Sequence, residues 1–186
     1  MHHNKEVLAY HEPSNRWVSF YDHKDTDGNW LDGYMAYKGR FFAFLSGAIY
    51  EMNSTSANRA TFFDKKHDVD VDFVINAVAN EVKVFNSIVL HSDGEWTGED
   101  IEIPSSLNYP NGMVSKIPST EWHEREGKYH AAFLRNMKTR SASATALDLR
   151  SGEPLRGETM YVQLTNTDIS KKRLLKVDVY YDISGV

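Results

Sequence analysis

The feature that most constrains the fold is a succession of short runs rich in β-branched and aromatic residues, separated by Gly, Asn, Asp, Ser and Pro. Runs of this kind are typical of strands, and the residues between them are those that form turns. Residues 69–75 begin with an alternation of Val and Asp, which puts one face of a strand in a core and the other in water. The sequence therefore predicts a chain rich in strands.

The first part of the chain predicts a small meander. Residues 22–29 are too polar for anything but a turn or loop, and residues 38–40 and 46–47 are compact turns between apolar runs. The expected strands are residues 16–21, 34–37, 41–45 and 48–52.

The rest of the chain predicts further strands. Residues 122–134 are either a β-hairpin that turns near Glu126 and Gly127 or a helix interrupted by Gly127. The last two expected strands lie on either side of a polar stretch and predict a closing hairpin. The expected strands are residues 69–75, 81–85 with the same alternation, 87–91, one within 96–103, 158–164 and 174–181.

Two regions predict irregular structure. Residues 104–118 contain three prolines and Gly112, which favours a long loop. Residues 138–146 are rich in Ser, Thr and Ala and would suit an exposed or partner-dependent segment.

The expected organisation is a flexible N-terminus over residues 1–11 and a single β-rich domain over 12–186, with room for a sub-boundary near 54–66. The first 55 residues could then form a separate meander that packs on the rest. The expected fold class is all-β, as an antiparallel β-sandwich or two packed sheets with long loops. An incomplete propeller-like arrangement is the alternative.

Charge and composition exclude several classes of function. The formal net charge of −5 does not predict the basic surface that binding to phosphates needs, so we expect no direct nucleic-acid binding. The absence of cysteine excludes disulfides, cysteine nucleophiles and thiolate zinc sites. The N-terminal residues lack an apolar signal core and no apolar run approaches the roughly 20 residues that span a bilayer, so we expect no membrane insertion.

Two groups of residues have some features of metal sites. Asp22, Asp25, Asp27 and Gly28 are similar to a calcium loop, but the EF-hand register lacks its first acid and its last glutamate, so a solvated turn is the preferred interpretation. His123 and His130 are seven residues apart, a spacing that puts them on opposite faces of one strand and fits no standard ligand pattern.

Patterns for catalysis are missing or incomplete. No serine lies in a G-x-S-x-G elbow, and residues 152–157 lack the lysine of a phosphate-binding loop. The carboxylates that could be nominated for a glycosidase pair alternate with apolar residues, as expected for the solvent-facing sides of strands. We therefore expect no enzyme, no catalytic or metal-binding residues and no cofactor. The nominated carboxylates are Asp70, Asp72, Glu99, Asp100 and Glu102.

The first 44 residues contain a dense set of aromatic side chains, which suggests a sugar-binding or protein-binding face. Strands commonly bury aromatic rings on one face, so we expect most of them in the core. They are Trp17, Phe20, Tyr21, Trp30, Tyr34, Tyr37, Phe41, Phe42 and Phe44.

Several short sequence segments, taken in their order along the chain, resemble those of a known group of proteins. They lie at residues 17–21, 42–53, 73–76, 83–86, 124–129, 135–136, 152–157 and 161–164. Over roughly residues 12–183, the chain resembles the C-terminal portion of tail and neck structural proteins of crAss-like and related short-tailed bacteriophages. Members of that group are often much longer, which leaves open whether this chain is a module of a longer protein.

The resemblance implies a structural virion protein, a tail, neck or nozzle component that assembles by protein–protein contacts. Its partners would be other phage virion proteins, in a homo-oligomeric ring, and its place would be the virion, assembled in the host cytoplasm. No catalytic residues come with the resemblance. The alternative is a carbohydrate-binding β-sandwich module, which the aromatic side chains and acidic loops suggest. A third hypothesis is a hydrolase with an unrecognised carboxylate site.

Overall fold

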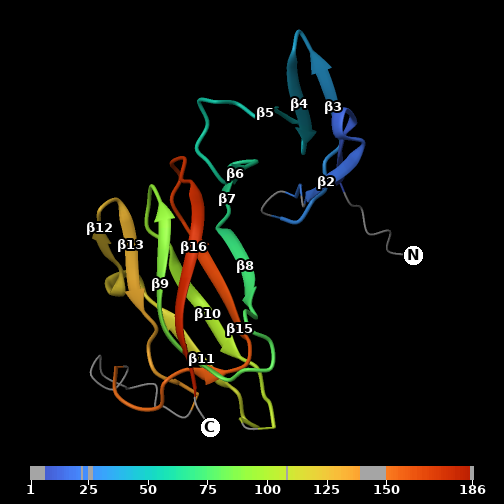
Figure 1. Cartoon of the computed structure of the whole chain (residues 1–186). Helices are drawn as coiled ribbons and strands as arrows, with labels where there is room; N and C mark the ends of the chain where they lie inside the picture. The colour runs from blue at the N-terminus through green and yellow to red at the C-terminus, as the bar shows by residue number, and fades with distance from the viewer. Residues whose placement is uncertain (1–6, 22, 25–26, 108, 139–149, 185–186) are drawn as a thin grey trace. The chain divides into compact units, whose positions relative to one another are not determined.

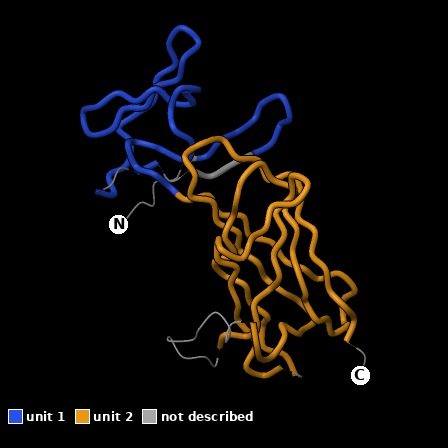
Figure 2. Tube along the Cα trace, turned by 90° about the vertical axis from the view of Figure 1, so that its left-hand side faces the viewer, with its two compact units in different colours: residues 1–67 blue, residues 68–186 orange. Residues whose placement is uncertain are grey.

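The structure is a computed structural model, and it describes residues 7–21, 23–24, 27–107, 109–138 and 150–184. It is nearly all β (Figure 1). The chain forms two compact units, residues 1–67 and 68–186 (Figure 2). The division lies next to the range 54–66 where a sub-boundary was expected, and the folding of 12–186 as a single domain stays a prediction.

Unit 1 is built from hairpins. Residues 7–11, expected to be flexible, form β1, which pairs antiparallel with β2. The expected meander is confirmed as the sheet β3-β4-β5. A small core lies against one face of this sheet and contains Ala43, Leu45 and Phe63. The strands are β1 Val7–His11, β2 Arg16–Tyr21, β3 Gly33–Tyr37, β4 Arg40–Leu45, β5 Ala48–Met52, β6 Thr61–Phe62 and β7 Lys65–Lys66.

Unit 2 consists of two antiparallel sheets that share one apolar core. One sheet has the order β11-β10-β15-β8, and the other has the order β12-β13-β9-β14 with β16 paired to β9. The expected fold class, antiparallel sheets packed together, is confirmed. The strands are β8 Val69–Ile75, β9 Lys83–Ser92, β10 Thr97–Ile103, β11 Met113–Ile117, β12 His123–Arg125, β13 Lys128–Ala132, β14 Arg156–Gly157, β15 Met160–Asn166 and β16 Leu174–Ile183.

The core of unit 2 forms because alternate residues of each strand point between the sheets. Ile88 and Leu90 of β9 are fully buried, as are Ile101 of β10 and Leu164 of β15. Strands β8 and β16 add half-buried side chains such as Phe73 to the same cluster. The alternation that predicted strands therefore also selects the side chains that hold the two sheets together.

The turn expected near Glu126 and Gly127 joins two neighbouring strands. Glu126 and Gly127 both have positive φ, +52° and +69°, and connect Arg125 to its pairing partner Lys128. Positive φ at both central residues is typical of a type I′ turn, which suits the twist of a hairpin. Residues 122–134 therefore contain a hairpin, and the helical alternative is wrong.

The predicted closing hairpin is wrong. Strand β15 lies between β10 and β8 in one sheet, whereas β16 pairs with β9 in the other. The connection therefore crosses from one sheet to the other, and the main chain and guanidinium of Arg173 donate hydrogen bonds to Asp93 at the far end of β9, at 2.5 and 2.9 Å. Sequence proximity favoured a local pairing, but both strands have long-range partners.

The predicted loop at residues 104–118 contains a strand. Residues 113–117 form β11, which pairs with β10 and turns Met113, Ser115 and Ile117 toward the core. The three prolines that suggested a loop lie outside this strand, so they do not interrupt its hydrogen bonds. The irregular segment 138–146 lies, apart from Lys138, outside the described residues.

Strand β9 begins with a buried lysine. The residues 81–85 were expected to alternate with Lys83 in water, yet Lys83 is fully buried and its ammonium group donates to the carbonyl oxygens of Glu81 and Glu158, at 2.8 and 2.5 Å. The expected position of Lys83 on the solvent side of the strand was wrong, because Lys83 and Phe85 both face the core. The ammonium group thereby joins the connection before β9 to the one before β15.

Replacing Leu164 by Ala should lower the free energy of unfolding by about 2–5 kcal/mol, since the change opens a cavity at the centre of the core. Leu175→Ala is the matched control, because Leu175 is 75% exposed and its truncation should change stability by less than about 0.5 kcal/mol. Chemical denaturation followed by tryptophan fluorescence measures both. Equal effects of the two substitutions would contradict the assignment of the core.

Replacing Lys83 by Met should lower the free energy of unfolding by about 1–3 kcal/mol, because two buried carbonyl oxygens lose their donor. Lys116→Met, at an exposed position of β11, makes the same chemical change without this loss and should leave stability nearly unaltered. Thermal denaturation of the two variants beside the parent chain checks the difference. A Lys83→Met chain as stable as the Lys116→Met chain would show that the buried ammonium group is dispensable.

Candidate interaction surfaces

The aromatic side chains of unit 1 are mostly not in its core. Tyr34, Tyr37, Phe41 and Trp17 are exposed, and Trp17 keeps 64% of its surface. Phe42 and Phe44, like Trp30, are half-buried, and the side chains of Phe20 and Tyr21 lie outside the described residues. The prediction that most of these rings are core is wrong, because the core of unit 1 is small: its buried members are Ala43, Leu45 and Phe63.

The opposite side of that sheet carries an apolar surface. Pairing of Met35 with Phe42 and of Phe44 with Ile49 puts these side chains on the face away from Ala43 and Leu45. Ile49 is 64% exposed. Contiguous exposed apolar side chains of this kind mark interaction sites rather than an ordinary protein surface. We call this surface the outer meander face, and it consists of Met35, Tyr37, Phe42, Phe44 and Ile49.

The acidic loop considered for calcium contributes a core residue. His23 is buried, its Nδ1 lies 2.7 Å from the hydroxyl oxygen of Tyr34, and its ring contacts Phe62 and Phe63. Burial raises the pKa of the Tyr34 hydroxyl. Asp27 is exposed, while Asp22 and Asp25 lie outside the described residues. The described part of this loop thus supports hydrophobic packing around a histidine.

The hairpin brings together the two histidines that the sequence separated. His123 pairs directly with His130 across β12 and β13, so the prediction that they lie on opposite faces of one strand is wrong. His130 in turn pairs with Val89 of β9, next to His91. Within the described residues, no group of three or more His, Asp or Glu side chains is placed to hold a metal ion.

The nominated carboxylates lie where the alternation put them. Asp70 and Asp72 are exposed on β8, and Asp100 and Glu102 are exposed on β10. Glu99 is exposed at an irregularity of the pairing between β10 and β15. The interpretation of these acids as the wet faces of strands is confirmed.

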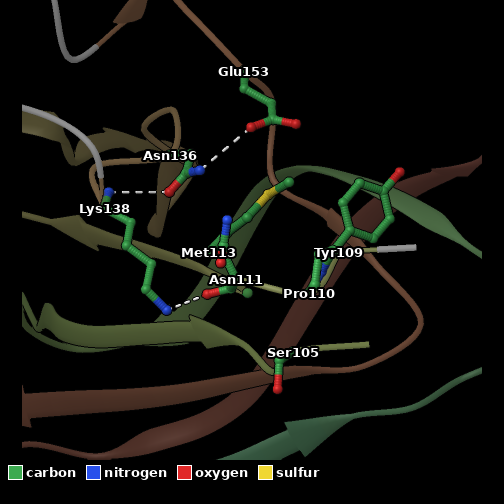
Figure 3. A pocket seen from close by; sticks show the side chains of 9 residues that line it. Ser105, Tyr109, Pro110, Asn111, Met113, Asn136, Lys138 and Glu153 are labelled. Carbon is green, nitrogen blue, oxygen red and sulfur yellow. Dashed lines mark hydrogen bonds between the residues drawn. The ribbon is translucent and has the colours of Figure 1, made fainter. Parts of the chain in front are cut away.

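An open hollow of about 670 Å³ lies beside β11. Figure 3 shows its polar lining: the Lys138 ammonium group donates to the carbonyl oxygen of Asn111, and the Asn136 amide reaches the Glu153 carboxylate at 3.4 Å. Tyr109 adds an aromatic ring to the wall. One cation, one carboxylate and amides in an open hollow are suited to accepting a polar side chain of another molecule.

The hollow depends on Gly112, which sequence reasoning noted only as a loop residue. Gly112 is buried with φ +61°, and a Cβ atom there would lie 2.6 Å from the carbonyl oxygen of Ile103. Only glycine combines this backbone conformation with so close an approach to another main chain. Gly112 therefore lies directly against residues 103–105 at the end of β10.

Gly112→Ala should destabilise the chain by at least about 2 kcal/mol, because it adds a clash to an unfavourable φ. Gly127→Ala is the matched control: its φ is also positive, at +69°, but a Cβ atom would meet open space, so a loss of about 1 kcal/mol is expected. Urea denaturation of both variants measures the difference. If the two losses are equal, the contact with Ile103 does not constrain this wall of the hollow.

The fold and these surfaces are those of a β-structural module with several places for contact with other molecules. A family model described as the Crassvirus muzzle protein C-terminal domain matches residues 57–136, which run from the end of unit 1 through β13. A search of curated proteins found no match. The family match supports a structural protein of a crAss-like phage, so the predicted resemblance is confirmed at that level. None of the helices in the described part of the chain is long and apolar enough to cross a membrane.

Proposed function

We propose that this chain is a structural component of the tail, neck or nozzle of a tailed phage, and that it works by binding other virion proteins in a homo-oligomeric ring. The observation that carries the proposal is the match of residues 57–136 to the C-terminal domain of the Crassvirus muzzle protein. The matched region contains β11 and most of the lining of the hollow, including Tyr109 and Asn136. We propose a binding role without catalysis.

The outer meander face supports this role. Its side chains lie on a three-stranded sheet held by hairpin turns, so an apolar surface is presented on a preformed scaffold. Preformed surfaces bind without the entropic cost of ordering a segment. A patch with Tyr37 and Phe42 beside the Arg40–Glu51 ion pair has the composition of a protein interface, with aromatic rings next to a polar rim.

The test is the mass of the purified chain, alone and mixed with tail and neck proteins of a crAss-like phage, by light scattering with size exclusion. A discrete multimer or a stable co-complex is expected. Ile49→Glu should weaken a complex made through the outer meander face, whereas Leu175→Glu, at a more exposed apolar position of β16, should not. A chain that stays monomeric with all of these proteins would contradict the proposal.

A carbohydrate-binding module is the second candidate. The exposed ring of Trp17, with Tyr10 edge-on at 5.0 Å between ring centroids, is the observation that favours it, because sugars stack on exposed aromatic rings. Glycan-array binding that is lost in Trp17→Ala, together with a strictly monomeric chain, would favour this candidate over the virion protein.

A further inference from the structure

The outer side of the four-stranded sheet of unit 2 is acidic. Asp72 and Asp100 both pair with Gln163 of β15, from opposite sides, and Glu102 pairs with Tyr161. Asp70 lies on the same side, where its carboxylate accepts a hydrogen bond from the Thr165 hydroxyl at 2.7 Å. These residues alternate with the core residues of β8 and β10, so their side chains share the outer face. We call this the acidic face: Asp70, Asp72, Asp100 and Glu102.

The outer side of the five-stranded sheet is basic. Arg125 pairs with Lys128 across the hairpin, and His91 pairs with Lys176. His130 lies between His123 and Val89 in the adjacent row. These positions alternate with the core residues of β9, β13 and β16, which places them on the side away from the core. We call this the basic face: His91, His123, Arg125, Lys128, His130 and Lys176.

Each face keeps an excess of its own charge. Asp178 and Asp182 are acids on the side of the basic face, and the Asp178 carboxylate lies 2.7 Å from Lys176 Nζ and 2.8 Å from His91 Nε2. Lys116 of β11 is a cation on the side of the acidic face. Lys176 and His91 hold the pKa of the Asp178 carboxyl below its usual range. Among the ion pairs of the described residues, none involves Arg125, Lys128 or the carboxylates of the acidic face. Both faces therefore present charges that a partner can pair.

A tyrosine lies on each face among the charges. Tyr161 is 48% exposed next to Glu102, and Tyr180 is 54% exposed on β16 next to Asp178 and its neighbours. Tyrosine combines a large apolar area with a polar tip and is enriched among the residues that dominate interface energies. An acidic and a basic face, each with an aromatic side chain, match each other in both charge and composition.

We propose that copies of this chain associate head to tail, with the acidic face of one copy against the basic face of the next. This inference rests on the proposed ring. The two faces lie on opposite sides of one core, so their pairing is heterologous and repeats from copy to copy. Such a contact generates a ring when the rotation between successive copies closes. A two-fold dimer through either face would oppose like charges and is disfavoured.

Charge reversal of one face at a time tests the proposal on the full chain. Arg125→Glu with Lys128→Glu makes both faces acidic, and Asp72→Lys with Asp100→Lys and Glu102→Lys makes both faces basic. Each variant alone should self-associate at least about tenfold more weakly than the parent chain, because like charges then meet. An equimolar mixture of the two should regain assembly, since each variant complements the other. Sedimentation velocity at low and high salt is the measurement.

The matched control is Lys65→Glu with Lys66→Glu, which makes the same change in net charge as Arg125→Glu with Lys128→Glu but on the exposed strand β7 of unit 1. It should assemble like the parent chain. Recovery on mixing cannot come from misfolded variants, so it supports the proposal. If the parent chain forms a multimer that neither reversal weakens, the head-to-tail contact is wrong while the ring stands. If the parent chain is monomeric at low salt and high concentration, the contact is refuted. Failure to bind tail and neck proteins as well would refute the proposed function.

Discussion

The apolar core between the two sheets of unit 2 is the constraint on which the rest of that unit depends. Leu90, Ile101 and Leu164 meet there from three strands and two sheets. Side chains alternate along a strand, so once these residues are buried the register of every neighbour is set. A slip of one residue would place Asp72 or Glu102 in the core and expel its leucines and isoleucines. The distribution of charge on the outer faces is thus a consequence of burial within.

The same constraint explains why a buried lysine is tolerated. Phe85 must face inward for β9 to contribute to the core, and Lys83, two residues earlier, faces the same way. Its long side chain reaches main-chain carbonyl oxygens in two connections, so the charge is solvated by the protein instead of by water. A polar residue at the rim of the core therefore joins segments that lie far apart in the sequence.

The two units offer different kinds of surface. Unit 1 presents apolar side chains on a small sheet whose core contains only a few residues. The sandwich of unit 2 presents acidic side chains on one outer face, basic side chains on the other, and a polar hollow. The family match begins before β6 and ends after β13, and so includes the acidic residues of β8 and β10 and all but Lys176 of the basic face. Apolar anchors and charged faces on one chain suit a protein that contacts several neighbours at once.

The sequence by itself determined most strands and the local turns. Residues 16–21, 48–52 and 69–75 were delimited correctly, because alternation and turn residues act within a few positions along the chain. The turn at Glu126 and Gly127 is also local, since a type I′ turn requires positive φ at its two central residues.

Only the tertiary structure decided which strands pair and which faces are covered. Strands β15 and β16 lie close in sequence but belong to different sheets, and His123 meets His130 through a turn that ends one strand and begins the next. The exposure of the Trp17 and Tyr37 rings was also decided by the tertiary structure, because a side chain is buried only where another part of the chain packs against it. The physical reason is common to these cases: strand pairing and burial are set by contacts between distant residues, and alternation alone does not specify the partner.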